Sequence, residues 1–89
     1  MGSAFSKCDN LITIEIPNSV TVIDHHAFNK CSKLTSITLG NKVILVSGYA
    51  FSNCTNLSEV NYKGTEEQWN KISIEVGNDY LLKAKRNYI

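Results

Sequence analysis

Three cysteines are the residues of this 89-residue sequence with the most obvious capacity for chemistry. A cysteine thiolate can bind a metal ion, attack an electrophile or form a disulfide. Cys8, Cys31 and Cys54 follow one another in two equal 23-residue steps, and no C-x-x-C pair, a common spacing in metal and redox sites, is present. The regular step predicts a column of buried thiols that pack as small apolar side chains.

A second candidate is the stretch Asp24-His25-His26, which combines one carboxylate with two imidazoles. Zinc needs three or four ligands that converge, and the equivalent place one step later in the chain holds Ser-Gly-Tyr (47–49). We therefore interpret these residues as surface side chains at a corner. A Cys–His nucleophile pair is not expected either, because Cys31 is predicted to face the core.

The remaining motifs predict no catalytic, cofactor or metal site, since there is no general acid–base pair, glycine-rich phosphate loop or nucleophile elbow. The basic stretch KAKR (83–86) with Tyr88 belongs to a chain of net charge +1. This balance does not favour nucleic-acid binding, and no apolar run of about 18 residues predicts membrane insertion.

The 23-residue step of the cysteines is shared by apolar residues along most of the chain. A fixed period in the range of about 20–29 residues is typical of leucine-rich solenoids, in which stacked units bury a continuous core. The residues that keep the step are Ala4, Ala27 and Ala50; Phe5, Phe28 and Phe51; Leu11, Leu34 and Leu57; Ile14, Ile37 and Val60; Val20 and Val43; and Ile23 and Val46.

Each unit can be read as a series of short elements. The segment LTSITL (34–39) predicts a strand with Leu34, Ile37 and Leu39 inward. Turns are predicted at 17–19 and 40–42, and short extended pieces at 20–23 and 43–46 on the opposite side. A single helical turn (26–31 and 49–54) then leads to the next strand.

The composite pattern I-x-x-x-A-F-x-x-C-x-x-L-x-x-I-x-[IL]-P-x-S-V resembles the BspA-like subclass of leucine-rich repeats, and YKGTEEQWNKISI (62–74) is similar to the segment that closes such arrays. The second unit departs from the pattern with GNKV (40–43) and VILV (43–46). The resemblance implies a β-rich α/β solenoid, a right-handed stack of 23-residue units with an α-helical C-terminal cap. It also implies a cell-surface or secreted protein whose relatives adhere to host matrix proteins and to other cells.

The register divides the chain into units and a cap. Residues 1–3 (MGS) are interpreted as a remnant of recombinant expression, and nothing before Ala4 supplies the first half of a unit. We therefore expect the C-terminal part of a longer array, with an open apolar edge around Phe5, Leu11 and Ile14 that could support self-association. The predicted boundaries are 4–26, 27–49 and 50–64 (partial) for the repeats and 65–89 for the cap.

The cap is predicted to begin with a helix. Thr65 as N-cap and Gln68 three residues later form a capping-box pattern, and Trp69 and Ile72 would cover the last repeat. A second short helical turn (78–85) is expected with Asn78 as its N-cap, and residues 87–89 are expected to add a final strand.

Two outward surfaces are candidates for binding a protein partner. Regular solenoid faces of this kind serve as extended binding surfaces, although such a face can also be merely solvated. If Val43 and Val46 point inward, Ile44 and Leu45 point outward next to Val22 and offer an apolar contact; an inverted strand would bury them, and the sequence leaves both arrangements open. The predicted polar columns are Thr13, Ser36 and Glu59, and Glu15, Thr38 and Asn61.

The sequence thus predicts a non-enzymatic protein-interaction module, and adhesion is implied by the resemblance alone. One alternative is a structural spacer that supports a functional domain elsewhere in the parent protein. Another is a module attached to a catalytic domain elsewhere in that protein. The identity of a protein partner does not follow from these residues.

Overall fold

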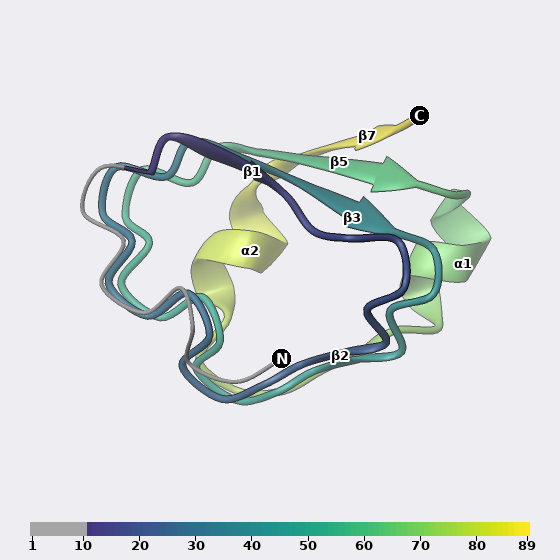
Figure 1. Cartoon of the computed structure of the whole chain (residues 1–89), viewed down its shortest axis with the longest axis horizontal. Coiled ribbons are helices and arrows are strands. Elements are labelled where there is room, and N and C mark those ends of the chain that lie inside the picture. The colour runs from purple at the N-terminus through teal and green to yellow at the C-terminus, as the bar shows by residue number, and fades with distance from the viewer. Residues whose placement is uncertain (1–10) are drawn as a thin grey trace.

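The computed structural model describes residues 11–89, in which the chain winds into a coil that adds one strand at a time to two parallel sheets (Figure 1). The first sheet has the order β1-β3-β5-β7, formed by Thr13–Glu15, Ser36–Gly40, Glu59–Lys63 and Lys85–Tyr88. The second has the order β2-β4-β6, formed by Val22–Ile23, Leu45–Val46 and Ser73–Ile74. We call one passage through both sheets a rung: β1 and β2 form the first, β3 and β4 the second, β5 and β6 the third, and β7 begins a fourth.

The rungs stack in the register that the repeat predicts. Thr13 pairs with Ser36 and Ser36 with Glu59, so each partner lies one full repeat further along the chain. Backbone hydrogen bonds join the rungs outside the strands as well, for example from Phe28 N–H to Ala50 O (2.8 Å) and from Ile44 N–H to Thr21 O (2.8 Å). Each rung therefore satisfies polar backbone groups of its neighbours.

The core lies inside the coil and consists of columns of equivalent apolar residues. Leu34, Ile37 and Leu39 are completely buried, as the strand pattern predicts. Phe28 and Phe51 stack with ring centroids 5.0 Å apart and planes 7° from parallel. Because equivalent side chains lie over one another, a repeated residue type packs against its own copy.

The cysteine column needs one addition to the sequence prediction. Cys31 and Cys54 are fully buried, as expected, and Cys8 lies outside the described residues. The Cys54 thiol also donates a hydrogen bond to Phe28 O at 3.0 Å. It therefore links the second rung to the first in addition to filling space.

The residues at one corner of the coil also form a column of equivalent positions. His26 and Tyr49 adopt left-handed backbone conformations (both φ 60°), and the corresponding corner of the third rung is Gly77 (φ 90°). The rings of His26 and Tyr49 are stacked, 6.1 Å apart. A Cβ atom at Gly77 would overlap the Tyr49 ring, so glycine is required where the column ends.

The closing segment, residues 65–89, contains two short helices and the last strand of each sheet. Helix α1 (Glu66–Asn70) begins with the predicted capping box, in which Gln68 N–H donates to the Thr65 hydroxyl (3.1 Å) and Thr65 N–H to the Gln68 side chain (2.9 Å). Helix α2 (Asp79–Lys83) lies across the opening of the coil and buries Leu81 (Figure 1). The expectation of a helical cap omitted β6, and the final strand begins at Lys85 instead of residue 87.

Asn78 is the N-cap residue of α2, as predicted, but its side chain has another role. That side chain makes no capping hydrogen bond and is buried, with 1% of its surface exposed. Its Oδ1 accepts from Phe51 N–H (2.9 Å), and its Nδ2 donates to Ser47 O (3.0 Å) and Glu75 O (2.8 Å). The equivalent Phe28 N–H in the rung before uses the backbone carbonyl of Ala50. Asn78 thus replaces, with its side chain, an acceptor that the next rung would otherwise supply.

We expect Asn78→Ala to lower the free energy of unfolding by about 1–3 kcal/mol, because one buried N–H and two carbonyls lose their partner. Urea unfolding followed by circular dichroism measures the change. Asn70→Ala is the matched control, since Asn70 is exposed at the end of α1. Equal stability of the two variants would contradict the role given to Asn78.

Candidate protein-binding surfaces

The outward side chains of the first sheet form two polar columns. Alternation along each strand places them opposite the buried residues such as Ile37 and Leu39. The structure brings together all six residues predicted for these columns and adds Lys85 and Asn87 from β7. We call this set the polar face: Thr13, Ser36, Glu59 and Lys85 in one column, and Glu15, Thr38, Asn61 and Asn87 in the other.

The two additional members were missed because the spacing changes at the end of the repeat. Glu59 pairs with Lys85 and Asn61 with Asn87, so the step lengthens to 26 positions. The signal that could have shown the start of β7 is the alternation in KRNY (85–88), which was obscured because its inward position is the polar Arg86. The Arg86 guanidinium lies 4.8 Å from the centre of the Trp69 ring, and its Nε donates to the Tyr88 hydroxyl at 3.2 Å.

Hydrogen bonds connect the polar side chains at the β7 end of this face. The Asn87 side-chain amide donates to Asn61 Oδ1 at 3.0 Å and to Glu59 Oε2 at 3.2 Å. Aligned amides on neighbouring strands thus hold each other in place. The result is an ordered arrangement of donors and acceptors on an open surface.

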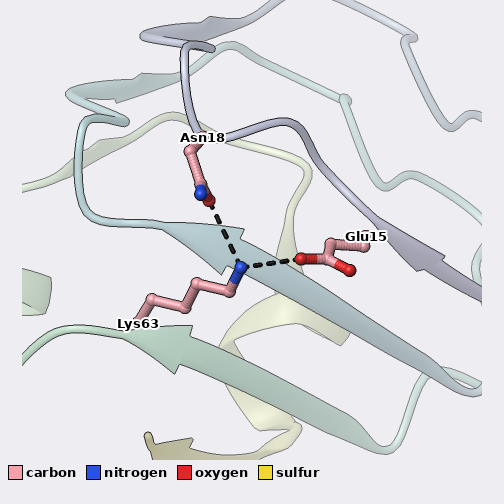
Figure 2. A network of polar contacts seen from close by, with 3 residues as sticks. All are labelled: Glu15, Asn18 and Lys63. Atoms are coloured by element: carbon pink, nitrogen blue, oxygen red, sulfur yellow. Dashed lines mark hydrogen bonds and ion pairs between the residues drawn. The ribbon is translucent and has the colours of Figure 1, made fainter.

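At the other end, Lys63 bridges the third rung to the first across β3 (Figure 2). Its Nζ donates to Glu15 Oε2 at 2.6 Å and to Asn18 Oδ1 at 3.3 Å. Gly40 lies beneath this bridge as the direct partner of Lys63 in the sheet. A Cβ atom at Gly40 would approach Asn18 Cα to 3.2 Å, so the missing side chain leaves room for Asn18 beside the bridge.

The same bridge sets the electrostatics of Glu15. Its hydrogen bond with Lys63, and then the positive charge of that residue, lower the pKa of the Glu15 carboxyl. On the interior side of the sheet, burial raises the pKa of the Tyr62 hydroxyl.

The apolar candidates lie on the second sheet. Val22 and Leu45 pair directly and are half-buried, whereas Ile44 just before β4 is 63% exposed. Val43 and Val46 are buried, so the strand has the first of the two orientations considered from the sequence. The surface formed by these residues is therefore accessible.

The structure also shows where the other residues considered for chemistry in the sequence lie. His25 and His26 are exposed at a corner, and no group of three possible metal ligands occurs within residues 11–89. Lys83 ends α2, and Lys85 and Arg86 belong to β7. Phe5, at the expected open edge, lies outside the described residues, and Leu11 and Ile14 are partly buried against the core.

A parallel coil with this register is the architecture of leucine-rich repeats, and the sequence comparison agrees. Residues 2–76 match the model of the "BspA type Leucine rich repeat region (6 copies)". The chain belongs to this family. No curated protein is significantly similar to this BspA-type chain, and no helix within residues 11–89 is long and apolar enough to cross a membrane.

One similar structure is that of a leucine rich cell surface protein from Faecalibacterium prausnitzii A2-165. It is 40% identical to this BspA-type chain, with a TM-score of 0.78, over 84% of this chain. The chain spans 20% of the length of that protein. The similarity therefore concerns one part of a much longer relative.

The ion pair between Glu15 and Lys63 makes the stability of the fold depend on pH. Because the folded-state pKa of Glu15 is depressed, its contribution is present above the unfolded-state pKa and is lost as the pH falls through the folded-state value. We expect a double-mutant cycle of Glu15→Gln and Lys63→Met to give a favourable coupling free energy at pH 7 that is smaller at pH 3, because the carboxyl becomes protonated as the pH falls. Urea midpoints at both pH values measure it.

The coupling should also shrink as salt is added, since both side chains are accessible to water. A coupling that is unchanged between pH 7 and pH 3 would show that the ionised carboxylate does not contribute.

Proposed function

We propose that this chain is a non-enzymatic protein-interaction part of a cell-surface or secreted repeat protein, and that it adheres through the polar face to host or matrix proteins or to other cells. The observation that supports this most is the polar face itself, four aligned strands whose outward side chains are small, polar or charged. The surface location is taken from the similar cell surface protein.

The chemistry of the polar face suits a protein ligand. Hydroxyls of Thr13, Ser36 and Thr38 donate and accept hydrogen bonds, and Glu59 and Lys85 place opposite charges side by side. The half-buried positions are fixed by the sheet, so few side chains must be ordered on binding. An extended protein surface with mixed charge could pair with these groups across several strands.

Structural spacing is a second candidate function, and one observation favours it. Several polar groups of the face already have partners within the chain: Lys63 with Glu15 and Asn18, and Asn87 with Asn61 and Glu59. A face whose groups satisfy one another needs no ligand. In this case the coil would only separate other parts of the parent protein.

We further propose that the coil is right-handed, as parallel strand crossovers are in about 98% of cases. The proposed repeat boundaries are those of the sequence register (4–26, 27–49 and 50–64), with residues 65–89 as a helical cap. The position of α2 across the coil and the burial of Trp69 and Leu81 support a capping role.

Binding to immobilised collagen, laminin and fibronectin, measured by biolayer interferometry, tests the adhesive function. We expect one or more of them to bind, and Ser36→Arg to weaken that binding about tenfold or more, because a large cation then stands at the centre of the polar face. Thr55→Arg adds the same side chain at an exposed site outside both sheets and should have no effect.

Two outcomes would decide against this proposal. If the chain binds none of these proteins and no epithelial cells, spacing is the better account. If Thr55→Arg weakens binding as much as Ser36→Arg, the polar face is not the binding surface.

A further inference from the structure

We propose that a groove between the second rung and α1 receives one large apolar side chain of a protein partner whose neighbouring residues are acidic. This docking site lies outside the polar face and does not depend on the function proposed for that face. The groove lies where the 23-residue register stops. In the first two rungs a turn follows the strand of the first sheet, whereas α1 follows β5 in the third rung.

Buried apolar side chains form part of the lining of the groove, beside the polar side chains of Asn41, Gln68 and Lys71. Val43, Tyr62 and Ile72 line it, and each exposes 9% of its surface or less. These residues come from the second rung, from β5 and from the segment between α1 and β6. An apolar group that enters the groove therefore leaves water for a surface that the core already holds in place.

The volume of the groove suits one large side chain of a partner. Its volume is about 260 Å³. Small-molecule sites usually have about 300–1,000 Å³, and a cavity of about 150 Å³ is sufficient for benzene. A phenylalanine or leucine side chain fits this range, and a larger ligand would extend onto the rim.

The groove exists before any partner binds, because several contacts fix α1. The Trp69 ring packs edge-on against Tyr62 with 5.3 Å between centroids, and the capping box with Thr65 and Gln68 holds the first turn. A preformed site needs little ordering on binding, which favours affinity.

The rim carries an unusual apolar residue. Ile44 lines the groove and is 63% exposed, although its backbone partner in the first rung is the exposed polar residue Thr21. Leu45 and Val22 continue the apolar surface along the second sheet. An isoleucine at an outward position next to a groove enlarges the area that a partner can cover.

The charge of the rim indicates the chemistry of the partner. Lys71 lines the groove, and Lys42 is exposed between two residues that line it, Asn41 and Val43. The ion pair within residues 11–89 joins Lys63 to Glu15 and uses neither of these lysines. A carboxylate beside the inserted side chain would meet Lys71 at the rim, and the exposed Lys42 adds positive charge close by in the chain.

The test is an NMR titration of the ¹⁵N-labelled chain with the peptide acetyl-Glu-Phe-Glu-amide. We expect amide shifts at Ile44, Lys71 and Ile72 at millimolar peptide. Acetyl-Glu-Ala-Glu-amide should bind about tenfold or more weakly, because it lacks the side chain that fills the groove. Acetyl-Lys-Phe-Lys-amide should bind about threefold or more weakly at low salt, because its charges are reversed.

Three protein variants test which residues are responsible for peptide binding. Ile44→Ser should weaken binding of the phenylalanine peptide, and Lys71→Gln should reduce the preference for the acidic over the basic peptide. Both side chains are exposed, so neither change should unfold the chain. Ser36→Arg, on the polar face, should leave peptide binding unchanged and so separates this proposal from the adhesive function.

The proposal is overturned if acetyl-Glu-Phe-Glu-amide causes no shift at Ile44, Lys71 and Ile72 at millimolar concentration. Equal affinity of the three peptides, or shifts centred on the polar face, would overturn it as well.

Discussion

The structure depends on one constraint: each rung satisfies the backbone hydrogen bonds of the next, so every rung must have the same shape. This requirement explains the constant length of the repeat, since an inserted residue would shift all later pairs. It also explains the left-handed corners at His26 and Tyr49, because a corner conformation adopted in one rung must be repeated in its neighbour. The stacked phenylalanines and the buried thiols follow from the same superposition.

The constraint creates a difficulty where the 23-residue register stops, because donors and apolar side chains there have no equivalent residue one repeat later. The closing segment resolves this locally and by different means at each position. Asn78 supplies an acceptor through its side chain, Gly77 makes room for the ring of Tyr49, and Trp69 covers Tyr62. Strands β6 and β7 continue both sheets by one strand each. Residues 65–89 are therefore less regular than the rungs before them.

This difference also explains how much could be predicted from the sequence. The repeat determined the strands, the inward residues and the polar columns, because successive copies of the unit reveal which positions are equivalent. In the closing segment no second copy exists for comparison, so local propensity placed Asn78 correctly at the start of α2 but did not show that its side chain bonds to the preceding rung. The final strand was expected two residues too late because Arg86 is polar at an inward position, which is usually apolar, whereas here the guanidinium lies over Trp69. The Lys63 bridge escaped prediction because it joins residues 48 positions apart.

The polar face is regular, whereas the groove lies in the irregular part of the chain. This difference affects how specifically each surface can bind a partner. The polar face presents side chains at the same spacing on each rung, and similar groups recur at Thr13 and Ser36 and at Asn61 and Asn87, so a ligand shifted by one rung would meet similar groups over part of the face. The groove beside α1 occurs where the regularity is lost, and its combination of Ile44, Lys71 and buried apolar side chains is not repeated within the rungs described. A partner that uses both surfaces would gain contact area from the polar face and a unique register from the groove. Among repeated units of similar shape, an irregular segment is the place where such a register can be defined.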